Sequence, residues 1–380
     1  LLVALVGMTS AKAQWVPLNS GTNYNLNSVY FTDINTGFVV GDSAIILKTT
    51  NCGNTWEMVP SGIIWEFIRI DLKSIFFIDY LTGYIAGGTT DWHGGGVRGV
   101  ILNTADGGET WEIIYDGGWS FKSIFFTSSI IGYGIAGNFC SNGSLLQSND
   151  GGNNWTSLQY PQSRSSVFFV NDSTGYVVGD NGIEKTIDGG VTCIELLSGI
   201  NYSLKSIDFI NEESGFVVGD NGIILKTITA GEQWTLQESG TTLCLNSVHM
   251  QNFDTSYIAG DSGTILKTTN GGNTLIKQYT GTANQLKCIY FINENVGYAV
   301  GSDGSILKTT NGGGTMGIYE EEQKTLLKIY PNPTKNKITI SSHSIAGNTN
   351  LSIFTISGEK AIERQLTTTE TQIDISALPR

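Results

Sequence analysis

Residues 215–234 read GFVVGDNGIILKTITAGEQW, and this stretch carries the pattern that decides the fold. It joins a Gly-aromatic-x-x-Gly segment, a glycine turn, the apolar segment ILKT and a polar loop that ends in tryptophan. The apolar runs here and elsewhere in the chain have the length of strands, and glycine-rich turns bound them. The stretch therefore predicts short strands connected by tight turns.

The same pattern occurs seven times at nearly constant spacing. One copy has an inserted residue and one has serine in place of the first glycine; the copies start at Gly37, Gly83, Gly132, Gly175, Gly215, Ser256 and Gly297. The steps between them are 46, 49, 43, 40, 41 and 41 residues. Each unit also opens with an apolar strand such as LKSIFF, which gives four strands per unit. Such units bury their faces only by stacking, so we predict an all-β, seven-bladed β-propeller.

The first and last repeats predict how the ring closes. The last repeat ends in GGGTMGIYEEE, which is a poor outer strand. Residues 14–21, QWVPLNSG, match residues 233–240, QWTLQESG, the outer strand of the fifth repeat. We therefore expect the N-terminal segment to complete the last blade, within a propeller over residues 14–319.

A polar loop of the type TADGGETW occurs in every repeat and resembles the Asp-box, or BNR, repeats of sialidases and related propellers. In such a loop an acid or amide caps its own turn and glycine takes a positive φ. The position reads Ala230 in the fifth copy, and the remaining structural positions are Asn51, Asp106, Asp150, Asp188, Asn270 and Asn311. Because several copies lack a carboxylate, we expect a structural role rather than catalysis or metal binding.

The repeats, especially GFVVGDNGIILKT at Gly215 and GYAVGSDGSILKTT at Gly297, resemble the propellers of the photosystem II stability and assembly factor family. The resemblance covers residues 14–315 and implies a propeller that binds protein partners. The motifs that carry the resemblance are structural, so they indicate the fold more strongly than the function. This propeller has only Arg69, Arg98 and Arg164 where that resemblance implies a basic docking patch, so we do not expect the photosystem role to transfer.

The two ends of the chain predict export. Residues 1–10 are almost wholly apolar and Ala11-Lys12-Ala13 follow, so residues 1–13 are interpreted as the remnant of a signal peptide. No other stretch is long and apolar enough to span a bilayer, so a soluble mature protein is expected. The predicted location is secreted or at the outer-membrane surface.

The composition changes after residues 320–322 into LKIYPNPTKNKITI. Residues 324–380, with Tyr330-Pro331-Asn332-Pro333, resemble the C-terminal sorting domain that type IX secretion cargo of Bacteroidota carry. The resemblance implies a small β-sandwich and contact with the type IX machinery. Family members usually continue past the position of Leu378 into a last strand, so this sequence is expected to be truncated at both ends.

The net charge and the composition of the chain indicate which classes of partner and cofactor it does not bind. A net charge of -13 disfavours nucleic acid and anionic lipid. The five cysteines and three histidines show no metal-binding spacing, so we expect no disulfide framework, metal or cofactor. The acids in the turns after the second strands are more simply hairpin residues than calcium ligands; they are Asp42, Asp180, Asp220, Asp261 and Asp303.

The candidate binding site rests on insertions that break the repeat symmetry. Residues 62–72, 87–99 and 116–121 enlarge connections on one face of the ring. We expect them to gather Trp65, Arg69, Trp92, His93, Arg98 and Trp119 into a ligand site. Aromatic side chains with a few hydrogen-bonding groups suit a sugar or a protein partner. The alternative is that these tryptophans only cover the edges of blades two and three.

The sequence favours a binding or scaffolding module for protein or glycan over an enzyme. The alternative is an Asp-box glycoside hydrolase, sialidase-like or polysaccharide-degrading. Sialidases hold a carboxylate with three arginines, and the family's Arg-Ile-Pro setting is absent because Arg69 is followed by Ile70 and Asp71. A catalytic pair of carboxylates elsewhere, the ligand, the process and the oligomeric state are left open.

Overall fold

The chain divides into two compact units, Ala13–Thr315 and a unit that contains Met316–Arg380. The structure is a computed structural model, and each unit is described by itself. The residues that it describes are 15–63, 69–89, 97–138, 141–158, 163–180, 182–197, 202–314, 328–330, 336–341, 349–354, 360–366, 368 and 370–376.

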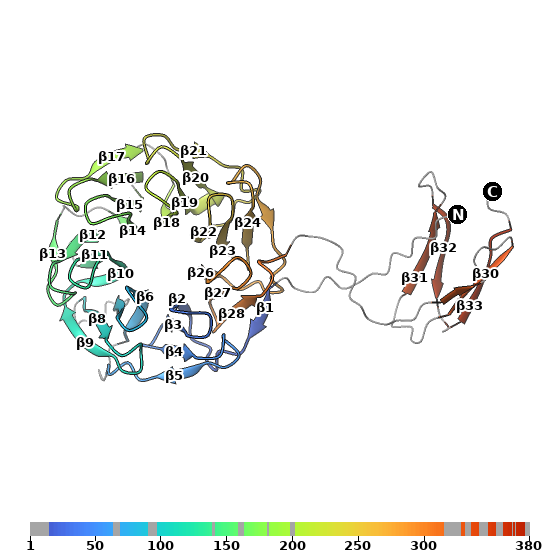
Figure 1. Cartoon of the computed structure of the whole chain (residues 1–380), viewed down its shortest axis with the longest axis horizontal. Helices are drawn as coiled ribbons and strands as arrows, with labels where there is room; N and C mark the ends of the chain where they lie inside the picture. Colours follow the sequence, from blue (N-terminus) through green and yellow to red (C-terminus); the bar gives the residue numbers. More distant parts are fainter. Residues whose placement is uncertain are drawn as a thin grey trace. The chain divides into compact units, whose positions relative to one another are not determined.

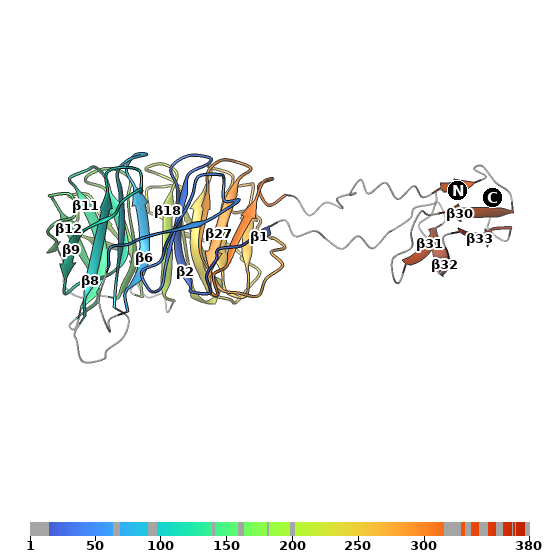
Figure 2. The same cartoon turned by 90° about the horizontal axis from the view of Figure 1, so that it is seen from below.

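The first unit is a closed ring of seven four-stranded antiparallel sheets (Figure 1), as the repeat spacing predicts. In each blade the first strand of the repeat lies innermost (Figure 1), and Figure 2 shows the same ring from its side. Blades one to three consist of β2 (Leu26–Phe31), β3 (Gly37–Gly41), β4 (Ile46–Thr49), β5 (Glu57–Val59); β6 (Asp71–Phe77), β7 (Gly83–Gly88), β8 (Gly99–Thr104), β9 (Glu112–Gly117); and β10 (Ser120–Phe126), β11 (Gly132–Asn138), β12 (Ser141–Ser148), β13 (Thr156–Ser157).

The remaining blades repeat this order, and blade five adds the short 3-10 turn η1 (Asp220–Gly222). Blades four and five consist of β14 (Arg164–Phe169), β15 (Gly175–Gly179), β16 (Gly182–Thr186), β17 (Ile194–Leu197); and β18 (Leu204–Phe209), β19 (Gly215–Gly219), β20 (Ile224–Thr227), β21 (Thr235–Leu236). Blades six and seven consist of β22 (Leu245–Met250), β23 (Ser256–Gly260), β24 (Ile265–Thr268), β25 (Ile276–Lys277); and β26 (Leu286–Phe291), β27 (Gly297–Gly301), β28 (Ile306–Thr309), β1 (Val16–Leu18).

The N-terminal strand closes the ring. Val16 of β1 lies opposite Lys308 of β28, so strands from the two ends of the propeller share one sheet. Trp15, just before β1, is fully buried in a cluster with Tyr257 and Phe291. The predicted closure by residues 14–21 is therefore confirmed for the described part of that segment.

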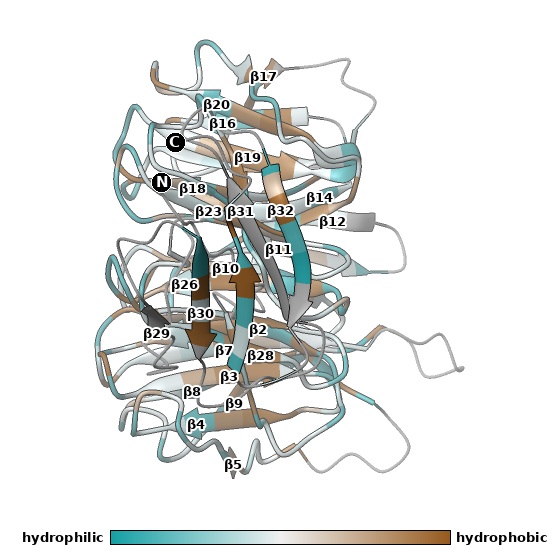
Figure 3. Ribbon diagram, turned by 90° about the vertical axis from the view of Figure 1, so that its right-hand side faces the viewer, coloured by the Kyte–Doolittle hydropathy of each residue, from teal (hydrophilic) through white to brown (hydrophobic). Residues whose placement is uncertain are grey.

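The core lies between the blades. Every residue of the Gly-aromatic strands β3, β15, β19, β23 and β27 is buried, because both faces of each sheet pack against neighbouring blades. Figure 3 shows the hydrophobic residues concentrated on the strands, with hydrophilic residues in the loops. Most innermost strands bury residues one, four and six and leave residues two, three and five partly exposed, as in β2.

The second unit contains two small antiparallel sheets. One has the order β29 (Lys328–Tyr330), β30 (Lys337–Ser341), β33 (Glu370–Asp374), and the other pairs β31 (Thr349–Phe354) with β32 (Lys360–Leu366). Ile338, Ile340 and Ile373 are buried in it. Over the part of the chain that the structure describes, no helix is long and apolar enough to cross a membrane.

Candidate functional site

The two faces of the ring carry different connections. On one face, here called the box face, the Asp-box loops lie beside the turns between first and second strands, as the hydrogen bond from Cys52 N–H to the Asn35 carbonyl shows (2.9 Å). On the other, here called the link face, the turns between second and third strands lie beside the links between blades. There the Asp42 N–H donates to the Asn25 carbonyl (2.9 Å).

Each Asp box is an internally hydrogen-bonded turn. In the second blade the Thr104 hydroxyl donates to Asp106 Oδ1 (2.7 Å) and accepts the N–H of Gly108 (2.8 Å). Asp106 also accepts the N–H and hydroxyl of Thr110. These hydrogen bonds, that of the Thr110 hydroxyl first, lower the pKa of Asp106 well below its usual range. The carboxylate therefore stays ionised and is occupied by its own loop.

In the Asp box of the fifth blade, the alignment inferred from the sequence is wrong by one residue. The position equivalent to Asp106 is held by Thr229, whose hydroxyl accepts the N–H of Gln233 (3.0 Å). Ala230 occupies the next position, where its φ of 53° matches the φ of 59° at Cys52 in the first copy. A hydroxyl thus replaces the acid or amide of the other copies.

The boxes also join neighbouring blades. The Tyr298 hydroxyl (2.7 Å) and the Lys308 ammonium (2.5 Å) both donate to the Cys52 carbonyl in the box of the next blade. The same pair recurs where Tyr176 and Lys185 donate to the Ala230 carbonyl. These contacts explain why the repeats combine a Gly-aromatic strand with ILKT. The box face is therefore engaged in holding the ring together.

On the link face, Arg69 lies between two buried carboxylates of blades one and two. Its guanidinium donates to Asp42 (2.9 Å) and Asp71 (3.0 Å), and Lys73 contacts both carboxylates at 3.3 Å. Burial opposes ionisation of Asp42, but hydrogen bonds from Asn27 and Asn25 and the charge of Lys73 lower its pKa overall. The Asp42–Asp71 pair is thus an ion-paired contact between blades.

Arg98 and Trp119 lie together at the boundary of blades two and three. Arg98 makes a two-pronged ion pair with Asp116, with Nε 2.6 Å from Oδ1. Trp119 is partly buried against the cluster that contains Phe121. A Cβ at Gly99 would lie 1.5 Å from the Trp119 carbonyl oxygen, so only glycine allows this close approach.

The other predicted site residues are not brought to this pair by any described contact. Arg69 contacts Asp42 and Asp71 instead. Trp65, Trp92 and His93 lie outside the described residues, so their grouping with Arg98 and Trp119 stays a prediction. Arg164 is buried and forms an ion pair with Glu184 (2.5 Å), which removes it from any docking surface.

Four lysines lie on the innermost strands near the axis. They were not considered in the sequence analysis, where basic patches were judged from arginines alone. They belong to the LKS, FKS and LKC segments in four innermost strands; they are Lys73, Lys122, Lys205 and Lys287. Lys205 pairs with Asp220 (3.5 Å) and Lys287 donates to Asn27 (2.9 Å). Acids from the adjacent turns thus pair with Lys73 and Lys205, and the link-face end of the axis has mixed charge.

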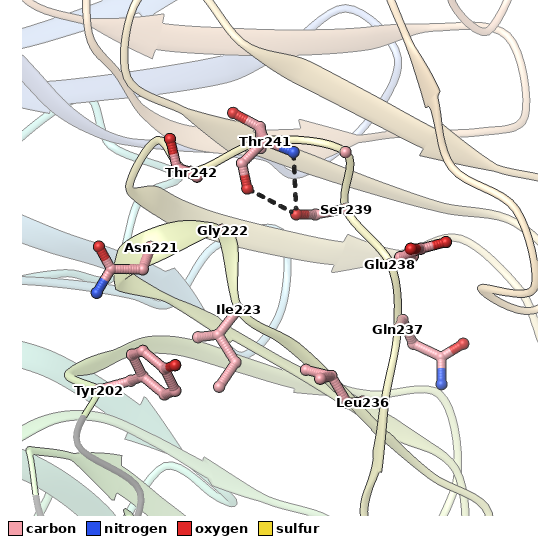
Figure 4. A pocket seen from close by; sticks show the side chains of 11 residues that line it. Tyr202, Asn221, Gly222, Ile223, Leu236, Gln237, Glu238, Ser239, Thr241 and Thr242 are labelled. Atoms are coloured by element: carbon pink, nitrogen blue, oxygen red, sulfur yellow. Dashed lines mark hydrogen bonds between the residues drawn. The ribbon is translucent and has the colours of Figure 1, made fainter.

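A groove of about 630 Å³ lies on the link face of blade five (Figure 4). Tyr202, Ile223 and Leu236 provide its apolar surface, and the exposed fractions of Tyr202 and Leu236 are 41% and 70%. The other lining residues are Asn221, Gly222, Gln237, Glu238, Ser239, Gly240, Thr241 and Thr242. Only Glu238 among the lining residues carries a charge.

The groove takes its shape from the link after β21. The Ser239 hydroxyl donates to the Thr241 carbonyl (3.1 Å) and accepts the Thr241 N–H (3.3 Å). A Cβ at Gly222 would lie 2.0 Å from the Thr241 carbonyl, and the φ of Gly222 is +70°. This groove was not predicted from the sequence, because only enlarged links were considered there and these links have ordinary length. The signal that the sequence offered was Tyr202 and Leu236, two large side chains at positions that the repeat places on the surface.

The closed ring of seven four-stranded blades, each with an Asp-box type hairpin, defines a seven-bladed Asp-box β-propeller. The sequence profile of photosynthesis system II assembly factor YCF48 matches residues 7–114 and 158–244, more than half of the chain. The chain therefore belongs to the YCF48 family, as the repeat motifs predict. Residues 328–380 match the secretion system C-terminal sorting domain.

Known relatives support the same fold. The photosystem II assembly lipoprotein Ycf48 of Synechococcus sp. (strain CC9902) is 26% identical over 152 residues, which are 39% of this chain and 40% of the relative. A structure of YCF48 bound to D1 peptide has a TM-score of 0.64 at 17% identity, over 81% of this chain and all of that chain. The GH74 xyloglucanase from Xanthomonas campestris has a TM-score of 0.65 at 12% identity, over 79% of this chain and 54% of that chain.

Proposed function

We propose that this protein is a binding module at the cell surface, whose propeller holds an extended segment of a protein partner on its link face. The observation that carries the proposal is the blade-five groove, with its exposed apolar side chains and nearly uncharged rim. The C-terminal unit would address the chain to the type IX secretion machinery, as its match to the sorting domain suggests.

The chemistry of the groove suits a peptide chain. Tyr202 and Leu236 are large side chains that expose apolar surface to water, and covering that surface stabilises a complex by roughly 25 cal/mol per Å². Gln237, Asn221 and Thr242 line the same groove with groups that can donate to or accept from a peptide main chain. The YCF48 relative bound to D1 peptide supports a protein partner over a glycan.

A second contact would lie on the same face, at the boundary of blades two and three. There Arg98 forms an ion pair with Asp116, and Trp119 is partly buried nearby. Trp65, Arg69, Trp92 and His93 would extend it, as the pattern of insertions predicts. Two separated contacts on one face fit an extended segment better than a compact ligand.

An enzyme is the alternative, since GH74 hydrolases share the propeller architecture. Glycoside hydrolysis needs one carboxyl that is protonated and a second that is ionised. Asp42 and Asp71, the closest pair of carboxylates described above, are both bound by Arg69 and Lys73. The pair therefore favours binding over hydrolysis.

The test screens random peptides and a glycan array against the purified full chain, and then measures the affinity of the best ligands by fluorescence anisotropy. The variant Tyr202→Ala combined with Leu236→Ser should weaken peptide binding by about tenfold or more. The control is Met58→Ser, because Met58 has the same place in the outer strand of blade one and is 65% exposed. Saturable binding of glycans but not of peptides, or equal affinities of the two variants, would contradict the proposal.

A further inference from the structure

The next-to-last residues of the seven innermost strands form a ring around the axis of the propeller, here called the axial tier. Its members are all partly exposed, and they are Tyr30, Phe76, Phe125, Phe168, Asp208, His249 and Tyr290. Neighbouring rings lie in contact, with centroids 5.0 Å apart for Phe76–Phe125, 5.1 Å for Phe125–Phe168 and 5.1 Å for Tyr30–Tyr290. Most of the tier is therefore an aromatic lining.

Two adjacent blades interrupt this lining with polar groups. Asp208 of β18 and His249 of β22 lie side by side, with Oδ2 and Nδ1 4.0 Å apart. Their side chains are 19% and 21% exposed, so solvent reaches them although protein surrounds them closely. The Asp208 carboxylate accepts a main-chain hydrogen bond from the N–H of Met250 (2.7 Å).

The charge of Asp208 has no cationic partner among the described residues, where no lysine or arginine forms an ion pair with it. Burial raises the pKa of Asp208 to about 7 and lowers the pKa of His249 to about 4. The imidazole is thus neutral near neutral pH and does not compensate the carboxylate. Among the described residues, Tyr290 also faces this pair, and its ring contacts that of Tyr30; burial raises the pKa of both phenols.

We propose that the axial tier binds one small alkylammonium ion, with Asp208 as its counter-ion and the aromatic rings around its alkyl groups. A carboxylate in apolar surroundings is costly unless a cation pairs with it, and an organic ammonium provides that charge. Aromatic rings favour methylated ammonium groups over hydrated inorganic ions. The limited exposure of Asp208 and His249 admits a slender solute rather than a folded partner.

The proposal is independent of the groove on blade five, because the tier is built from innermost strands and includes none of the groove residues. The probes are choline and its uncharged isostere 3,3-dimethylbutan-1-ol, titrated into the full chain by calorimetry at pH 8. Choline should bind with saturation, and the isostere should bind at least about tenfold more weakly. Equal binding of the two probes, or no saturable binding of choline, would overturn the proposal.

Variants locate the site. Asp208→Asn keeps the shape and the main-chain hydrogen bond but removes the charge, so choline affinity should fall by about tenfold or more. The control Asp220→Asn removes a partly exposed carboxylate at the link face and should leave choline affinity unchanged. Unchanged affinity of Asp208→Asn, in a variant that unfolds cooperatively like the natural chain, would overturn the assignment.

The pH profile of the unaltered chain gives a test that needs no variant. A proton and the ammonium ion compete for Asp208, so choline affinity should fall by about tenfold for each pH unit below the pKa near 7. Calorimetry at pH 6 in buffers of different ionisation enthalpy should report proton release on binding. A flat affinity between pH 5 and pH 8 would place the ligand away from Asp208.

Discussion

The indole of Trp15 packs edge-to-face against the ring of Phe291, with ring centroids 5.7 Å apart. Trp15 precedes the first strand and Phe291 ends the inner strand of the seventh blade, so this contact joins the two ends of the propeller. Trp15 is fully buried, and β1 pairs with β28. The short N-terminal segment therefore closes the ring.

Removing this contact should destabilise the propeller strongly. Trp15→Ala leaves a cavity among Tyr257, Phe291 and Leu286, and such a change typically costs about 3–5 kcal/mol of unfolding free energy. Deleting residues 14–20 should lower the melting temperature far more than deleting residues 324–380. Chemical denaturation and scanning calorimetry measure these effects, and equal melting temperatures of the two truncations would refute the prediction.

The Asp-box hydroxyl should be a second point of sensitivity. Thr104→Val keeps the shape of the side chain but leaves the buried N–H of Gly108 without its acceptor, which costs about 1–3 kcal/mol. Thr156→Val, at an exposed strand position, is the control and should change stability by less than about 0.5 kcal/mol. Urea denaturation of both variants compares them directly; similar losses would argue against a special role for the box hydroxyl.

The pH dependence of stability should reveal Asp208. Its pKa is about 7 in the folded chain and near 4 in the unfolded chain, so the folded state holds the extra proton between these values and Asp208 costs stability as pH rises. Asp208→Asn should therefore gain on the order of 3–4 kcal/mol relative to the natural chain between pH 4 and pH 8.

The gain should stop growing above about pH 7, where Asp208 is ionised in both states. His249 has the opposite effect, because its lowered pKa makes the folded chain gain stability as pH rises from about 4 to 6.5. Urea denaturation of both proteins at each pH separates the two groups. A stability difference that does not change with pH would show that Asp208 titrates as it does in the unfolded chain.

The proposed contact at blades two and three predicts a loss of binding without a loss of fold. Replacing Trp65, Trp92 and Trp119 together with alanine should abolish binding of the peptide ligand, because aromatic anchors carry most of the energy of such contacts. Circular dichroism and thermal melting check the fold. Retained affinity would move the binding site to the blade-five groove alone.

The proposed boundary between propeller and sorting domain can be tested by limited proteolysis. Repeats end before residues 320–323 and the composition changes there, so cleavage should occur near this point and release an intact propeller. Mass spectrometry identifies the cut. Cleavage spread over the blades would contradict the boundary.

The ring was predictable because its determinants are local and repeated. Each blade has a Gly-aromatic strand or a close variant of it, a third strand that reads ILKT or a variant of it, and a box loop. QWVPLNSG was recognisable as an outer strand because it matches QWTLQESG of the fifth repeat. The alignment of the Asp boxes was wrong in the fifth copy. There the Thr229 hydroxyl accepts the hydrogen bond that an acid or amide accepts in other copies, and the sequence suggested Ala230 for that position.

The sites were less predictable because they join residues from separate repeats. Tyr202, Ile223 and Leu236 reach one groove from a link, a turn and the outer strand β21, and no single motif contains them. The ion pair of Arg69 with Asp42 could not be predicted from the sequence either, because Asp42 belongs to the preceding blade. Asp208 and His249 also belong to neighbouring blades, and only the common register of the innermost strands brings them together.

The pairing of β1 with β28 fixes the order in which the molecule can be completed. Val16 leaves the ribosome before any blade exists, whereas its partner Lys308 follows nearly three hundred residues later. Until that strand arrives, the seventh blade is absent and the N-terminal strand has no sheet to join. The ring therefore cannot close before β28 has been synthesised.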